Sequence, residues 1–108
     1  PNIAVVGLSE AQAKKEGREI KVSKPVTGAN PKAIINNDPR GFVKIIADLK
    51  TRKLLGAALM CSCATDMVGE FSMAIANGLT VDQLALGMRP HPTFNESVGE
   101  ATRIFPKD

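Results

Sequence analysis

The only histidine of the chain, His91, stands between two prolines, and Glu96 follows five positions later. Proline restricts its own backbone and that of the residue before it, so we expect His91 to lie in a stiff, extended segment. Thr93 or Asn95 could then cap a helix that carries Glu96 in its first turn. The segment is suited to hold an imidazole rigidly beside a carboxylate.

A histidine beside a carboxylate is a candidate acid–base pair. A free imidazole titrates at about pH 6.5, and a carboxylate that accepts from one ring nitrogen leaves the other free to exchange protons. In Cys–His pairs the same arrangement stabilises a thiolate. The alternative for His91 is a structural histidine that only hydrogen-bonds the backbone, and one His and one Glu five positions apart do not exclude it.

The two cysteines, Cys61 and Cys63, do not form a disulfide framework. Two positions apart on a strand they would share a face, and a bridge between them would be strained. Two thiols with one distant histidine are also too few for a structural zinc site, so we predict no metal. We expect reduced, packed thiols, which are typical of a cytoplasmic protein.

Composition excludes several classes of partner. The net charge is +3, and most lysines and arginines fall in the first half of the 108 residues. However, the chain lacks Trp and Tyr for stacking on bases and has no recognisable nucleic-acid motif, so nucleic-acid binding is only a weak alternative. No apolar run reaches the roughly eighteen residues of a membrane helix, and we predict no membrane partner.

The apolar pattern predicts short strands first and helices afterwards. Strands are expected over residues 3–6, 20–26, 41–49 and 54–60, the last two as a hairpin, and a helical turn or loop begins at residues 30–31. Helices are expected over residues 9–16, 65–77, 80–86 and 95–104. This order favours one α+β domain, with an antiparallel β-sheet flanked by helices. Because the strand at 41–49 is apolar on both faces, we expect both to be covered.

Several motifs, in order along nearly the whole chain, resemble those of the pyridine nucleotide-disulfide oxidoreductases. These FAD flavoproteins include dihydrolipoamide dehydrogenase and glutathione reductase. The similar segments are VGLSEAQA at 6–13, GFVK at 41–44 with LLGA at 54–57, AIANGLTVDQL at 74–84, and HPTxxE at 91–96. The resemblance is to the C-terminal dimerisation domain of that family, and it implies that residues 1–108 are such a domain.

The resemblance implies a homodimer in which each copy completes the active site of the other. His91, oriented by Glu96, would be the acid–base group at the partner's dithiol or disulfide, and the backbone at His91 and Pro92 would approach the partner's flavin. The FAD domain, the NAD(P) domain and the redox cysteines would precede this segment in a longer flavoprotein. The chain itself lacks the glycine fingerprint of a dinucleotide site, so we expect it alone to bind neither FAD nor NAD(P)H and to be inactive.

Two departures from the family pattern bear on function. Arg89 stands where many dihydrolipoamide dehydrogenases have another histidine, which leaves the substrate within the family open. Residues 61–63 replace a Gly-Pro-x stretch of many members, and we do not assign Cys61 and Cys63 as the redox pair. The alternative to an enzyme part is a stand-alone module that uses the same fold only to form homodimers.

Overall fold

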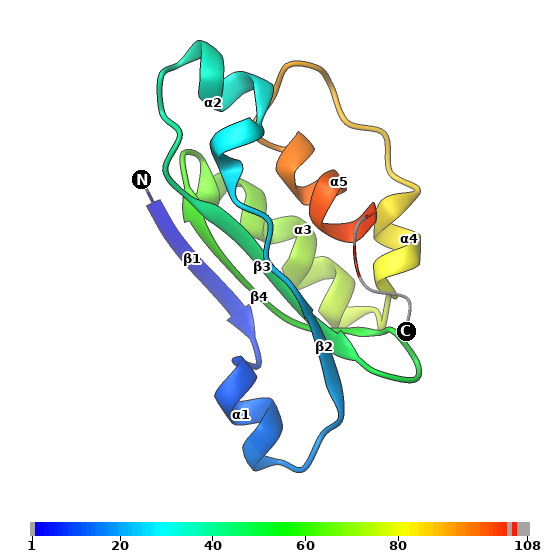
Figure 1. Cartoon of the computed structure of the whole chain (residues 1–108). Coiled ribbons are helices and arrows are strands. Elements are labelled where there is room, and N and C mark those ends of the chain that lie inside the picture. Colours follow the sequence, from blue (N-terminus) through cyan, green and yellow to red (C-terminus); the bar gives the residue numbers. More distant parts are fainter. Residues whose placement is uncertain (1, 104, 106–108) are drawn as a thin grey trace.

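The protein forms two layers, a four-stranded sheet and a set of helices packed against one of its faces (Figure 1). The computed structural model describes residues 2–103 and 105. The strands are β1 (Asn2–Gly7), β2 (Ile20–Ser23), β3 (Phe42–Asp48) and β4 (Leu54–Cys61). The helices are α1 (Glu10–Lys15), α2 (Pro31–Ile35), α3 (Ala64–Ala76), α4 (Val81–Ala85) and α5 (Glu96–Arg103), with a 3-10 turn η1 at Thr27–Ala29.

The sheet has the strand order β1-β4-β3-β2, and every neighbouring pair is antiparallel. This confirms the predicted α+β fold and the hairpin of β3 with β4. At the hairpin turn, the Asp48 carboxylate accepts from the backbone N–H groups of Lys50 (2.9 Å) and Thr51 (2.8 Å). β2 is shorter than predicted, because Pro25 has no N–H to donate to a regular ladder.

The core lies between the sheet and α3, α4 and α5. The predicted helix at 65–77 is confirmed as α3, and its apolar residues lie four apart in a stripe on one face: Met67 and Phe71 are buried, and Ile75 is partly buried against the same cluster. The strand residues that face this stripe share apolar side chains and near-complete burial. They include Val43, Ile45, Ala57 and Leu59. Burial of each larger side chain, Val43, Ile45 and Leu59, contributes about 2 kcal/mol, so these contacts hold the two layers together.

The helix starts predicted at residues 9 and 80 are confirmed, because each depends on contacts within a few residues. Ser9 caps α1 and Thr80 caps α4, each in a complete capping box with a glutamine three positions on. Each cap contributes about 1 kcal/mol. The last helix, expected over residues 95–104, begins at Glu96 and runs to Arg103, and Ile104 lies outside the described residues.

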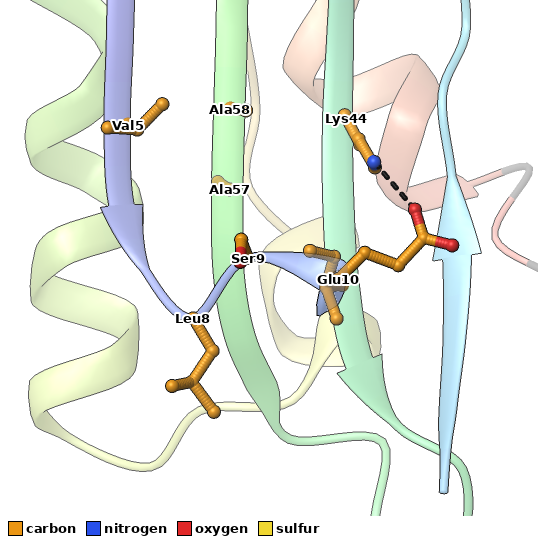
Figure 2. Close-up of a pocket in the computed structure, with 8 residues that line it drawn as sticks. Val5, Leu8, Ser9, Glu10, Lys44, Ala57 and Ala58 are labelled. Atoms are coloured by element: carbon orange, nitrogen blue, oxygen red, sulfur yellow. Dashed lines mark ion pairs between the residues drawn. The ribbon is translucent and has the colours of Figure 1, made fainter. Parts of the chain in front are cut away.

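The second face of the sheet is covered at Ile46 of β3, the strand expected to be covered on both faces, but is open at β1. Ile46 is 2% exposed, but Ile3 and Val5 on β1 are 71% and 72% exposed. The turn from β1 into α1 crosses this face over Gly56 of β4. Beneath it lies a shallow hollow of about 160 Å³, and Glu10 reaches across it to pair with Lys44 at 2.6 Å (Figure 2).

Candidate functional site

The histidine lies on the loop between α4 and α5, which passes close to α2 at one end of the sheet (Figure 1). The sequence predicted an extended segment here. Instead the chain bends at His91 and Pro92, and the peptide bond between them is cis. Both side chains are exposed at the tip of the bend. The histidine is therefore presented outward and is not part of the core.

The structure brings His91 and Glu96 together, as the spacing predicted. His91 Nδ1 lies 3.0 Å from Oε1 and 3.1 Å from Oε2 of Glu96, the first residue of α5. The other ring nitrogen, Nε2, has no hydrogen-bond partner within residues 2–103 and 105. The imidazole is 67% exposed and the carboxylate 25% exposed. The pair thus has one fixed nitrogen and one nitrogen open to an incoming group.

Backbone hydrogen bonding keeps Glu96 ionised. The Thr93 N–H donates to Oε1 at 3.0 Å, and this bond, together with the one from His91, holds the pKa of Glu96 below its usual value. An ionised carboxylate only accepts hydrogen bonds, so the neutral imidazole carries its proton on Nδ1. The lone pair of Nε2 then faces outward, which is the orientation a general base needs.

Asn30 fixes the same loop from the side of α2, and sequence reasoning missed it. Its Nδ2 donates to the Thr93 carbonyl and to Ser97 Oγ, both at 3.0 Å, while its Oδ1 caps α2 by accepting from Ala33 N–H. Asn30 is 3% exposed, so these bonds form away from water. An Asn before a proline signals a helix cap in sequence, but nothing there reveals the contact with residue 93.

A groove of about 390 Å³ runs beside the histidine loop. It is lined by Lys32, Cys63, Met67 and residues 92–95. The prediction of packed thiols holds for Cys61, which is 1% exposed, but is wrong for Cys63, which is exposed. β4 ends at Cys61, and Cys63 takes a left-handed backbone conformation at the start of α3, so the two thiols do not share a strand face.

Burial raises the pKa of the Cys61 thiol, so it is a poor nucleophile. Among residues 2–103 and 105, no three His, Cys, Asp or Glu side chains gather as a metal site would require. In the same part of the chain, no helix is long and apolar enough to cross a membrane. Near the histidine loop, the groups that could take part in chemistry include the His91–Glu96 pair and the exposed Cys63 thiol.

Comparison with known sequences gives one consistent picture. A family model described as "pyridine nucleotide-disulphide oxidoreductase, dimerisation domain" matches residues 1–102. A dihydrolipoyl dehydrogenase of Pseudomonas putida is 41% identical over 101 residues, which cover 94% of this chain and 22% of that enzyme. A mercuric reductase of Bacillus cereus is 41% identical over 108 residues, all of this chain and 17% of that enzyme. The chain thus spans about a fifth of these relatives.

Solved structures agree with the sequence comparison. The flavoprotein disulfide reductase RclA of Escherichia coli, induced by HOCl, superposes with a TM-score of 0.89 and 33% identity over 94% of this chain and 23% of that one. LpdA of Mycobacterium tuberculosis gives a TM-score of 0.87 with 25% identity over 94% of this chain and 22% of its own. Both likenesses confirm the fold and the family resemblance drawn from the motifs.

Proposed function

Because this chain belongs to the dimerisation domains of the pyridine nucleotide-disulphide oxidoreductases, we propose that it supplies a His–Glu acid–base pair to the active site of a second copy. Members of this family are FAD- and NAD(P)-dependent enzymes, and dihydrolipoyl dehydrogenases are among the relatives of this chain. The whole protein would be a homodimer that moves electrons between NAD(P)H and a dithiol or disulfide. The observation that carries the proposal is the outward-facing Nε2 of His91, fixed by Glu96 through Nδ1.

The proposed chemistry follows from this geometry. His91 Nε2 accepts a proton from a substrate thiol as the thiol is oxidised to a disulfide. In the reverse reaction it returns the proton to the thiolate that forms. Glu96 stabilises the imidazolium that forms, because its carboxylate is ionised and in direct contact with Nδ1. Such a group contributes about 10²–10⁴-fold to the step it serves.

The histidine loop would contact a flavin that is bound by the partner subunit and would not bind the cofactor itself. His91 and Pro92 are exposed at the bend, so their backbone is open to a flavin held by the partner subunit. When bound, FAD would supply electron transfer between the pyridine nucleotide and the thiols. The chain by itself offers no glycine fingerprint for a dinucleotide, and we propose that it is inactive without the FAD and NAD(P) domains of its parent protein.

The test is His91→Ala in the full-length protein, measured by stopped-flow in two half-reactions. We expect the thiol–disulfide half-reaction to slow by about 10²-fold or more, while flavin reduction by NAD(P)H is unchanged. Met88→Ala is the matched control, since Met88 lies on the same loop and is 98% exposed. Sedimentation of each variant checks the proposed dimer.

Equal losses in both half-reactions would refute the acid–base role, because His91 touches only the thiol step in this scheme. A monomer at micromolar concentration would refute the composite site. The reading frame that encodes the chain distinguishes an enzyme part from a stand-alone dimerising module. Upstream FAD and NAD(P) domains support the enzyme, and their absence supports the module.

A further inference from the structure

Arg89 anchors the base of the histidine loop, two positions before His91. Its guanidinium makes two parallel contacts with Glu70 on α3, from Nη1 to Oε1 at 2.7 Å and from Nη2 to Oε2 at 2.6 Å. Nη1 also donates to Asn95 Oδ1 at 2.7 Å. A longer contact from Nη2 reaches the Leu84 carbonyl of α4 at 3.4 Å. One side chain therefore connects α3, α4 and the start of α5.

The Arg89 side chain has little freedom to move. It is 8% exposed, and a paired, fork-shaped contact fixes both the distance and the plane of the guanidinium. On α5, a methyl group at Gly99 would lie 3.0 Å from Arg89 Cδ and Nε, so the side chain packs directly on the helix backbone. The glycine leaves the space that the arginine occupies.

Arg89 and its contact Asn95 lie near the two members of the proposed acid–base pair in sequence. Arg89 precedes His91 by two residues, and Asn95, which accepts from Arg89, immediately precedes Glu96. The link from Arg89 to Asn95 therefore closes the loop that contains His91 at its tip. Within this closed loop, His91 Nδ1 lies 3.0 Å from Glu96 Oε1.

We propose that Arg89, locked by Glu70 and Asn95, is a positioning residue for the His91–Glu96 pair. The inference rests on the acid–base role proposed above and adds the group that sets its geometry. Lysine would not replace this arginine, because an ammonium is a point charge without the planar fork that bonds Glu70 and Asn95 together. Nothing in the contacts places Arg89 itself on the reacting atoms.

The test uses four variants of the full-length protein: Arg89→Lys, His91→Gln, the double variant, and Asn95→Ala. Arg89→Lys should slow the thiol–disulfide half-reaction about tenfold or more, since a misplacement near 1 Å is costly in an oriented step. It should leave flavin reduction by NAD(P)H unchanged. In the His91→Gln background it should have no further effect. Asn95→Ala keeps the ion pair and should give a smaller loss of the same half-reaction.

Arg52→Lys is the matched control, because Arg52 also contacts a carboxylate twice, with Nε 2.7 Å and Nη2 3.1 Å from Asp82, away from the loop. Normal turnover in His91→Gln would overturn the acid–base role and this inference with it. A crippled His91→Gln beside a normal Arg89→Lys and Asn95→Ala would overturn this inference alone. Losses from Arg89→Lys that persist undiminished in the His91→Gln background would show a purely structural arginine and would also overturn it.

Discussion

Gly56 is a position where adding one methyl group should destabilise the fold strongly. It lies in β4 beneath the turn from β1 into α1, and a Cβ there would be 1.9 Å from the Leu8 carbonyl oxygen and 2.9 Å from Leu8 N. The backbone of Leu8 is itself hydrogen-bonded to the neighbouring Leu55 carbonyl at 3.0 Å. Both obstacles are main chain, so no side-chain rotation relieves the clash.

The geometry sets the magnitude expected for Gly56→Ala. To restore ordinary contact the Leu8 oxygen must move from 1.9 Å to at least 3.4 Å, which separates the turn from the sheet. Overpacking of this kind costs about 1–3 kcal/mol, and the broken Leu8–Leu55 hydrogen bond adds about 1 kcal/mol. The gain from removing a glycine in a strand is below about 1 kcal/mol. We expect a net loss of about 1–3 kcal/mol, or a fall in Tm of about 5 °C or more.

The same substitution at Gly69 is the matched control. Gly69 lies inside α3, is exposed, and a Cβ there meets no atom within 4 Å. Gly69→Ala should therefore stabilise the chain by about 1 kcal/mol through helix propensity alone. Thermal unfolding is followed by far-UV circular dichroism, since the chain has no Trp or Tyr for fluorescence, at one fixed concentration of protomer.

A Gly56→Ala chain with the stability of the parent would refute the close crossing of Leu8 over β4. Equal changes in stability from Gly56→Ala and Gly69→Ala would refute the reasoning more broadly, because the two sites would then respond to the methyl group itself and not to its surroundings.

Two further predictions concern thiols and pH. Cys63 should be alkylated by iodoacetamide while Cys61 stays protected in the folded chain, because Cys63 is exposed and burial raises the pKa of Cys61; equal labelling by peptide mapping would contradict this. The pKa of Glu96 is lowered in the fold, so its stabilising contribution is complete above its unfolded pKa of about 4.5 and is lost as pH falls through the folded value. Glu96→Gln should accordingly weaken the dependence of stability on pH below about 4.5, measured by denaturant unfolding. The same pH dependence in both proteins would contradict the contacts of Glu96 with Thr93 and His91.

Local features of the sequence predicted their own geometry well. Ser9 and Thr80 form caps with partners three positions away, and Glu96 meets a histidine five positions away, so each interaction is contained in one short segment. The contact of Asn30 with the Thr93 carbonyl spans 63 positions, and that of Arg89 with Glu70 spans 19. Such contacts depend on how α2, α3 and α5 pack, which no short window of sequence encodes.

Cys63 shows a second limit of the same kind. The apolar pattern predicted a strand only as far as residue 60, and nothing in residues 61–63 marks a chain reversal. The backbone at Cys63 is left-handed, a conformation that usually signals glycine in sequence. The strand runs to Cys61, one residue beyond its predicted end, and the Cys63 thiol turns to the groove.

The supports of the histidine loop also argue for a site completed from outside the chain. Asn30 and Arg89 hold its two sides through buried bonds, while the imidazole at its tip is 67% exposed. A general base works best in a preorganised site from which water is excluded. This chain positions the imidazole but does not shield it from water. A loop with a rigid base and an exposed tip is suited to be covered by a partner subunit. That combination supports the proposal that the cover, with its thiols and flavin, comes from the partner subunit.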